Sequence, residues 1–227
     1  MEAACASSMP RLLQEIPKAL MSRSGKVFYS GRAAFTQNCP LYMLGINPGG
    51  DPEVLRSETV GSHSTWVLKQ APEEWSAYRD ESWNGVRPGA YGMQPRVLHL
   101  LGRLGLNPAR VPASNLVFVR SRRQDDLADF ERSAAECWPF HHQVIEECKP
   151  RVVVCFGKRA GDYVRRRLGA TTREDRFEEL NARRWESTTH VASCGLRIVT
   201  LTHPSIANWR TRETDPSDIV LRALRTT

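Results

Sequence analysis

Two polar side chains that could bind one ligand stand far apart in the sequence, each directly after an apolar run. Asn47 lies within residues 41–50 (LYMLGINPGG), and His203 lies within residues 198–205 (IVTLTHPS). Each segment predicts a buried strand that runs into a sharp polar turn. In an open parallel sheet such strand ends meet at the carboxyl edge, where ligands bind. We therefore expect the amide of Asn47 and the imidazole of His203 to face one ligand.

A second interpretation of these turns stays open. An asparagine in a turn often bonds only its own backbone, and His203 in His-Pro-Ser could be a turn residue in the same way. The glycines around Asn47 allow the backbone to approach a ligand closely, but they also suit an ordinary turn. The two segments taken singly therefore indicate either a site or two structural turns.

The elements that must position these residues alternate along the chain. Apolar runs predict strands at residues 41–46, 115–119, 151–156 and 196–201. Helical spacing predicts helices at residues 10–21, 94–106, 129–148, 158–168 and 218–224, the last capped by Ser217. Residues 51–91 are expected to form a long connection, and the charged residues 170–194 an excursion or a hairpin. This alternation predicts an α/β fold, a three-layer α/β/α sandwich around a mostly parallel four-stranded sheet.

Length and composition favour one domain over residues 1–227. With 227 residues, 41% of them hydrophobic, the chain can bury one sizeable core. No apolar stretch approaches the roughly 20 residues of a membrane span, and the first residues do not form a signal peptide. We expect a cytoplasmic protein, or a nuclear one if the source is eukaryotic, with no membrane partner. The net charge of +7 is a moderate excess, which a solvated basic surface would also explain.

The six cysteines argue against a metal site and against structural disulfides. They include no C-x-x-C pair and no spacing typical of zinc or iron–sulfur ligands. We expect reduced thiols, no metal and no cofactor.

The two turns gain specificity because they match motifs of one family. Residues 45–49 match the Gly-x-Asn-Pro-Gly motif of the uracil-DNA glycosylase superfamily, and residues 202–205 resemble its His-Pro-Ser motif. Residues 114–121 (SNLVFVRS) resemble the strand that carries the base-reading residue, and residues 152–160 resemble the third strand with its Gly-Lys-x-Ala turn. The resemblance covers roughly residues 41–209 and is strongest to the mismatch-specific thymine/uracil and single-strand-selective branches. It implies a fold like that of the uracil-DNA glycosylases.

The resemblance also implies an activity and roles for three residues. It implies a monofunctional DNA glycosylase that hydrolyses the N-glycosidic bond of uracil or a related deaminated base, as in base excision repair. His203 would donate a hydrogen bond to the base carbonyl as negative charge develops, and Asn47 would hold the attacking water. Asn115 would read the edge of the base, because its amide offers a donor and an acceptor in one plane. Alternatively, Asn115 only caps the start of a strand.

Further residues are expected to bind the base or the DNA. Ile46 joins Asn115 as a base-binding residue, and an extruded base also needs an aromatic face. Tyr91 is the candidate for that face and Trp83 the alternative, although either could be ordinary core. DNA, single- or double-stranded, is the expected partner of a monomer. It would contact turn amides, a hydroxyl, basic side chains and a wedge residue, at Gly49, Ser205, Arg120, Arg122, Arg123, Trp209 and Arg210.

Three departures from the family pattern bear on the activity. Strongly active relatives often carry an aspartate where this chain has Asn47, so we expect a slower or more selective enzyme unless Asp51 reaches the site. Ala207 stands where several relatives place a wedge, and residues 51–91 exceed the length that the most similar branches would need. An alternative is therefore a weak or inactive protein on the same fold that only binds nucleic acid. A third interpretation is a nucleotide-binding or hydrolytic α/β protein whose resemblance is coincidental.

Overall fold

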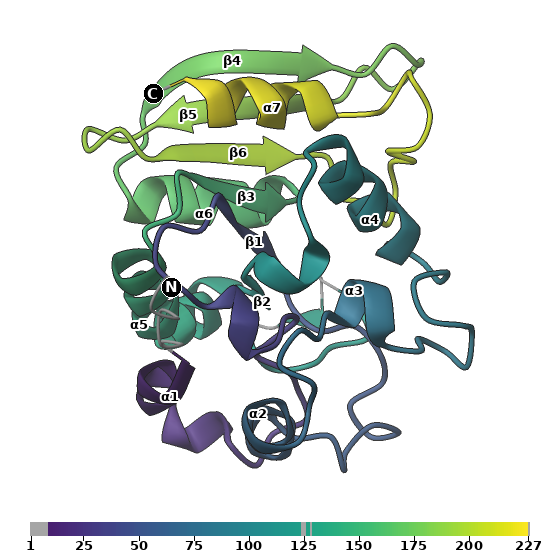
Figure 1. Cartoon of the computed structure of the whole chain (residues 1–227), viewed down its shortest axis with the longest axis vertical. Coiled ribbons are helices and arrows are strands. Elements are labelled where there is room, and N and C mark those ends of the chain that lie inside the picture. Colours follow the sequence, from purple (N-terminus) through teal and green to yellow (C-terminus); the bar gives the residue numbers. More distant parts are fainter. Residues whose placement is uncertain (1–8, 124–125, 128, 227) are drawn as a thin grey trace, which may run out of the picture.

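The chain folds into a six-stranded mixed sheet with helices on both of its faces (Figure 1). The computed structural model describes residues 9–123, 126–127 and 129–226. The strands are β1 (Leu41–Gly45), β2 (Ala113–Asn115), β3 (Val152–Phe156), β4 (Thr172–Glu178), β5 (Glu186–Val191) and β6 (Arg197–Leu201). The α-helices are α1 (Met9–Leu12), α2 (Val60–Lys69), α3 (Ala77–Asp80), α4 (Gln94–Arg103), α5 (Phe130–Cys148), α6 (Lys158–Arg167) and α7 (Ser217–Arg225).

Four parallel strands form the centre of the sheet, in the order β2-β1-β3-β6. Every residue of β1, β2 and β3 is buried, as expected for strands covered on both faces. In the register of the sheet, Gly45 of β1 lies beside Asn115 of β2, and Phe156 of β3 lies beside Leu201 of β6. The strands therefore end nearly level, so the turns that follow them share one edge.

Two further strands make the sheet larger than the four strands expected. β4 and β5 form an antiparallel hairpin, and β5 pairs antiparallel with β6, so residues 170–194 adopt the hairpin that was one of two expectations. β4 reads TREDRFE and is largely exposed at the edge of the sheet. Charged edge strands lack the apolar pattern of buried strands, which is why the sequence does not reveal this one.

Helices on both faces complete the predicted three-layer α/β/α sandwich. α6 and α7 both pack on β3 and β6, α7 in front of the sheet and α6 behind it in Figure 1. Gly161 of α6 lies so close to β6 that a Cβ there would overlap the side chain of Thr200. α5 is capped by the side chain of Asp129 and ends at Lys149 in the left-handed conformation, close to its predicted bounds.

The two ends of the chain differ from the expected helices. In place of a helix over residues 10–21, α1 ends at Leu12 and short 3-10 turns follow, because Ile16 is extended before Pro17. At the other end Ser217 is the first residue of α7 rather than its cap. Its backbone N–H and hydroxyl both donate to Oδ1 of Asp215, at 2.9 and 2.5 Å, so Asp215 caps the helix.

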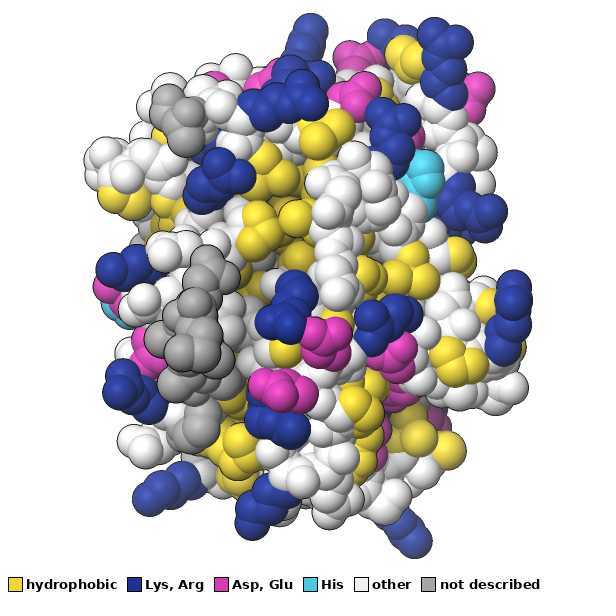
Figure 2. All heavy atoms as spheres, viewed as in Figure 1, with side chains coloured by type: hydrophobic (Ala, Val, Ile, Leu, Met, Phe, Trp, Pro, Cys, Tyr) yellow, Lys and Arg dark blue, Asp and Glu magenta, His cyan; other side chains and the backbone are white. Residues whose placement is uncertain are grey.

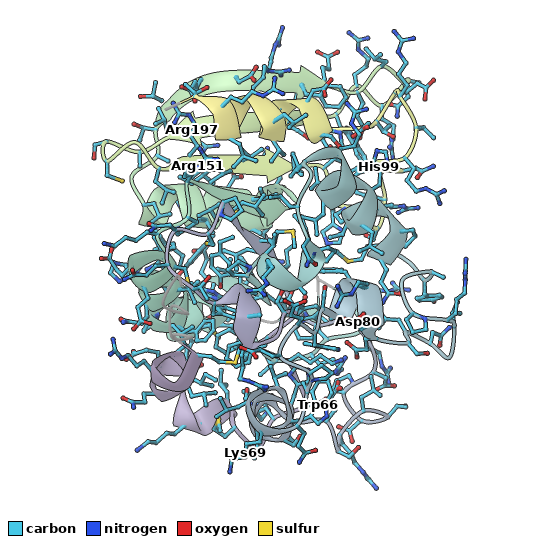
Figure 3. The ribbon with its side chains drawn as sticks, viewed as in Figure 1. Trp66, Lys69, Asp80, His99, Arg151 and Arg197 are labelled. Carbon is cyan, nitrogen blue, oxygen red and sulfur yellow. The ribbon has the colours of Figure 1, made fainter. Side chains whose placement is uncertain are left out.

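The segment over residues 51–91 is more ordered than the long connection expected. It contains α2, which begins with a capping box between Thr59 and Ser62, and the short α3. Trp66 of α2 packs against Trp75 with ring centroids 5.1 Å apart (Figure 3). Trp75 belongs to the main hydrophobic core and Trp66 packs against it, so the tryptophans attach this segment to the rest of the fold.

Within the described ranges no helix is long and apolar enough to cross a membrane. The cysteines placed by the structure are free thiols; Cys39, Cys137, Cys148 and Cys155 are buried and Cys194 is exposed.

Candidate active site

The expected site residues lie at the carboxyl ends of three strands of the parallel centre of the sheet. Asn115 ends β2, Asn47 stands two residues after β1, and His203 stands two residues after β6. β3 lies between β1 and β6 and is followed by Gly157. Since neighbouring strands are about 4.8 Å apart, the ends of β1 and β6 are separated by about 10 Å, enough for a flat ring between them.

The amide of Asn47 is held in one orientation by its nitrogen. Nδ2 donates to the hydroxyl of Ser121 at 2.8 Å, to the carbonyl of Pro48 at 3.0 Å, and more weakly to the carbonyl of Val119 at 3.5 Å. The hydroxyl of Ser121 in turn donates to the carbonyl of Arg123 at 2.7 Å, which leaves its oxygen to accept. No described residue donates to Oδ1 of Asn47, so that oxygen can accept a hydrogen bond from water.

The imidazole of His203 is held as a neutral ring with its Nε2–H as the available donor. The backbone N–H of Ser205 donates to Nδ1 at 3.1 Å, and the hydroxyl of Ser205 lies 2.7 Å from the same nitrogen. A nitrogen that accepts from a backbone N–H carries no proton, so the proton of the neutral ring is on Nε2. Burial also lowers the pKa of His203 to about 4, although part of the ring stays accessible. Ser205 therefore positions His203.

Gly157 keeps the space between Ile46 and His203 open. A Cβ at this position would lie 3.4 Å from Cδ2 of His203 and 3.7 Å from Cδ1 of Ile46. Its φ of 91° is also a conformation that other residues rarely adopt. The expected base-binding residue Ile46 and the expected catalytic residue His203 thus flank one glycine. Gly157 belongs to the Gly-Lys-x-Ala turn noted in the sequence, but it was not among the expected site residues.

Helix α6 points its positive end at this space. It begins at Lys158, immediately after Gly157, and the first-turn amides of a helix favour negative charge. A neutral donor at His203 and a helix N-terminus therefore lie at the same strand ends, and both suit an anion that forms there.

Asn115 is buried but incompletely bonded. Its side chain is 6% exposed, and its oxygen packs so closely over Gly45 that a Cβ on that glycine would overlap it. Nδ2 is buried without a hydrogen-bond partner among the residues that the structure describes. An orphaned buried amide is costly, so it suits a ligand that accepts a hydrogen bond there.

The aromatic candidates separate in the structure. Tyr91 is 42% exposed on a loop and is not core, whereas Trp83 packs against Tyr29 and Tyr78, with ring centroids 6.4 and 5.9 Å apart. Tyr29 is buried, which raises its pKa, and it lies near Asn115 without a hydrogen bond to Nδ2 of that residue. The sequence does not mark Tyr29 as a site residue, because it is brought near Asn115 only by the fold.

Arg120, expected to contact DNA, is buried and paired in the structure. Its side chain is 4% exposed, and its guanidinium donates to the carboxylate of Glu58 and to the carbonyl of Gly49. Glu58 also pairs with the buried Lys26 at 3.1 Å, and Lys26 pairs with Glu81 as well. Arg120 thus anchors the turn after Asn47 instead of binding phosphate.

The other basic and turn residues lie at the surface. Arg122 and Arg123 are exposed; Arg122 pairs with Asp51 at 2.5 Å, and this hydrogen bond lowers the pKa of the Asp51 carboxyl. Asp51 is therefore engaged by Arg122. A surface depression of about 210 Å³ lies beside this pair, lined also by Arg120 and Ser121. Gly49 faces open space, since a Cβ there would meet no protein atom within 4 Å.

Trp209, also expected to contact DNA, is buried as well. Trp209 is fully buried, stacks edge-on against Phe156 at 5.5 Å, and donates from its indole N–H to the carbonyl of Thr202 at 3.1 Å. It therefore supports the His203 turn from beneath. Arg210 is exposed, and so is Ile206, which is 54% exposed directly after His-Pro-Ser. Ile206 is therefore the apolar side chain exposed beside the His203 turn. The sequence does not reveal this, because it does not show which side chains are exposed.

Helix α4 ties the His203 turn to the rest of the site. Arg96 donates to the carbonyl of Pro204, and Nε2 of His99 lies 2.9 Å from the carboxylate of Asp215 (Figure 3). At the start of the same helix, Gln94 donates to the carbonyls of Ala77 and Glu81 at 2.8 and 2.7 Å. α4 therefore holds the segment beside β2 and the turn after β6 at fixed positions.

Comparisons with known proteins agree with this geometry. Residues 32–225 match the family model of the uracil DNA glycosylase superfamily, whose members are typically DNA glycosylases. A search of curated proteins finds no match. Within the described residues, no three His, Cys, Asp or Glu side chains group so as to hold a metal ion. The family match extends over most of the chain and includes all four strand ends of the site, so the chain belongs to the uracil DNA glycosylase superfamily.

Proposed function

We propose that this protein is a monofunctional DNA glycosylase that removes uracil or a related deaminated base from DNA. The observation that carries the proposal is the state of His203, a neutral ring with Nε2–H as its available donor. This donor shares the carboxyl edge of the sheet with Oδ1 of Asn47 and Nδ2 of Asn115, neither of which has a partner among the described residues.

The reaction breaks the bond between the anomeric carbon of the sugar and the base nitrogen. The bonding electrons leave with the base, which becomes an anion, while positive charge develops on the sugar. His203 donates from Nε2–H to the base carbonyl, and the N-terminus of α6 favours the same negative charge. The departed base then takes a proton from solvent.

Asn47 orients the attacking water. Oδ1 accepts a hydrogen bond from the water, whose oxygen forms the new bond to the anomeric carbon and whose released proton passes to solvent. A neutral amide does not take that proton, and it opposes the sugar's positive charge less than a carboxylate would. The protein is therefore expected to be slower or more selective than relatives with an aspartate.

Asn115 and the neighbouring apolar groups bind the extruded base. Nδ2 of Asn115 donates to a base carbonyl, which gives the buried amide its missing partner. The base lies between Ile46 and His203 in the space that Gly157 leaves open. Tyr91 is exposed and stacks on the extruded base, and Ile206 fills the position vacated in the duplex.

The DNA backbone runs along the exposed rim of this edge. Gly49 permits close approach of a phosphate, and Arg122, Arg123 and Arg210 supply positive charge.

The alternative is a protein on the same fold that binds damaged or single-stranded DNA without excision. The amide at Asn47 favours it, because Asp51, the nearest carboxylate in sequence, is paired with Arg122. The two functions differ in one observable, which is turnover.

The test is an excision assay with single- and double-stranded oligonucleotides that carry uracil, hypoxanthine, xanthine or a G:T mismatch, read by alkaline cleavage at abasic sites. We expect cleavage of at least one substrate. Asn47→Ala and His203→Ala should each lower its single-turnover rate by about 10²–10³-fold, because each removes a group that acts in the transition state.

His142→Ala is the matched control, because His142 is an exposed histidine of α5. Its rate should equal that of the wild type. No abasic sites from any substrate would overturn the enzymatic proposal, and salt-dependent binding without turnover would then favour the alternative.

A further inference from the structure

The tip of the β4–β5 hairpin, residues 179–185, lies at the same edge of the molecule as the candidate active site. β5 is antiparallel to both β4 and β6, so β4 and β6 run in the same direction and end at the same edge. Figure 1 shows the tip beside the loop that connects β6 with α7. The hairpin tip and the His203 turn are therefore neighbours in the fold, although no sequence motif links them.

Hydrogen bonds tie the hairpin tip directly to the His203 turn. Arg183 donates from Nη1 to the carbonyl of Ile206 at 2.9 Å, and the backbone N–H of Leu180 donates to the carbonyl of Glu213 at 2.9 Å. Glu179 is 1% exposed, and its carboxylate accepts from Arg183 at 3.0 Å and from Asn181 at 2.9 Å. The tip is thus held rigidly relative to the turn that carries His203.

The hairpin tip exposes apolar surface next to Ile206. Leu180 is 60% exposed and Trp185 40% exposed, beside an Ile206 that is 54% exposed. The guanidinium of Arg183 lies 4.3 Å from the centroid of the Trp185 ring. In Figure 2, both basic and acidic side chains lie around hydrophobic atoms at the end of the molecule where the hairpin lies. Clustered exposed apolar side chains indicate an interaction surface, and an aromatic ring paired with arginine is typical of surfaces that stack nucleic-acid bases.

We propose that the hairpin tip is a second DNA contact, in which Trp185 stacks on an unpaired base next to the extruded nucleotide. The inference rests on the proposed binding of DNA at the neighbouring site. A strand whose nucleotide enters the space beside His203 must pass over Ile206, and Arg183 bonds the tip to the carbonyl of that residue. Two acidic side chains of the tip are already paired, Glu179 with Arg183 and Glu178 with Arg184, whereas the exposed Glu213 beside Leu180 has no ion pair among the described residues. The ring of Trp185 and the side chain of Leu180 form the outward apolar contact.

Stacking on Trp185 requires a base that is not inside a duplex, so the contact should favour single-stranded or locally opened DNA. Base–aromatic stacking is worth enough to change affinity by about tenfold. Trp185→Ala should therefore weaken binding of a single-stranded oligonucleotide about tenfold and that of a fully paired duplex much less. Trp185→Phe keeps a ring and should bind nearly as well as the wild type.

The experiment measures fluorescence anisotropy of labelled uracil-containing oligonucleotides, single-stranded and duplex, with the full chain and these variants. Met21→Ser is the matched control, because Met21 is an exposed apolar residue that contacts α2, at the opposite end of the molecule in Figure 1. An unchanged affinity of Trp185→Ala, an equal loss on both DNA forms, or a loss matched by Met21→Ser would each overturn the proposal.

A second measurement separates this inference from the proposed function. Single-turnover excision at saturating enzyme should be unchanged in Trp185→Ala, because the ring binds DNA outside the reacting atoms. If the wild type excises no base, the proposed activity fails while the anisotropy result still decides the hairpin contact. A lowered rate at saturation with unchanged affinity would contradict a role in binding.

Discussion

At the scale of single residues, the groups around Asn47 suit an amide better than a carboxylate. Its nitrogen donates towards the carbonyls of Pro48 and Val119 and to the hydroxyl of Ser121. An aspartate here would place negative charge against two carbonyl oxygens, which would disfavour its ionised form. The surroundings of Asn47 therefore match the amide that the chain carries.

The tautomer of His203 leads to a prediction about pH. Because burial lowers its pKa to about 4 and Ser205 donates to Nδ1, the ring should remain neutral, with its proton on Nε2, from pH 8 to about pH 5. Nitrogen-detected NMR of the imidazole rings should show this tautomer and no titration near 6.5, where an unperturbed histidine titrates. The excision rate should likewise show no inflection from His203 between about pH 5.5 and 7.5.

The urea-unfolded chain, titrated over the same pH range, is the control for this measurement, since its histidines have lost their partners. A His203 ring that titrates near 6.5 in the folded protein, or that carries its proton on Nδ1, would contradict the assignment.

At the scale of elements, the site depends on the glycine that follows strand β3. β3 lies between the strands that carry Asn47 and His203, and Gly157 follows it at a φ of 91°. Any larger residue would occupy the space between Ile46 and His203 and would also strain the backbone.

Gly157→Ala tests this requirement. The variant should lose about 1–3 kcal/mol of unfolding free energy from backbone strain. Its single-turnover excision should fall further than this loss explains, because the new methyl group enters the space between Ile46 and His203. Urea denaturation measures the first effect and the excision assay the second.

Gly169→Ala provides the comparison, because Gly169 also has a positive φ, of 62°, but a Cβ there meets no protein atom within 4 Å. It should lose stability and keep its excision rate at saturating substrate. Equal excision by the two variants would show that Gly157 does not shape the site.

At the scale of the whole molecule, two buried histidines link stability to pH. His63 packs between Trp66 and Trp75, with both ring nitrogens unpartnered among the described residues, and His141 lies in the core against Tyr42. Burial lowers the pKa of each to about 3. Between pH 6.5 and 3 the unfolded chain therefore binds protons that the folded chain does not, so stability falls as the pH falls.

The expected size is about 2 kcal/mol of unfolding free energy lost between pH 6 and pH 5, roughly one proton for each of the two histidines. Urea denaturation at pH 7, 6 and 5 measures it. His63→Phe should remove about half of this dependence, and it should not destabilise the fold at pH 7, because the lost ring nitrogens make no hydrogen bond in the described structure. A pH dependence as steep as that of the wild type would contradict the contribution of His63.

The parallel centre of the fold and the composition of the site could be predicted from the sequence. Apolar runs such as residues 152–156 leave few alternatives to a buried strand, and polar turns after such strands must meet at one edge. The hairpin strands and α2 were harder to predict, because β4 is a charged edge strand and α2 depends on a local cap and on packing between tryptophans. The pattern of apolar residues along a sequence indicates which elements are buried. These elements are only partly buried, so the pattern reveals them poorly.

The sequence by itself determined that Asn47 and His203 follow buried strands, because strand runs and turn residues are local features. The strand expected over residues 115–119 is β2 at residues 113–115 instead, so Asn115 ends a strand that it was expected to begin. Only the tertiary structure decided which nearby side chains face solvent. Arg120 is neutralised by Glu58, 62 residues away, and Trp209 is covered by Phe156, so neither lies on the surface beside the site. Ile206 and the hairpin tip occupy that surface instead. Exposure depends on contacts between distant segments, and those contacts form only when the chain has folded.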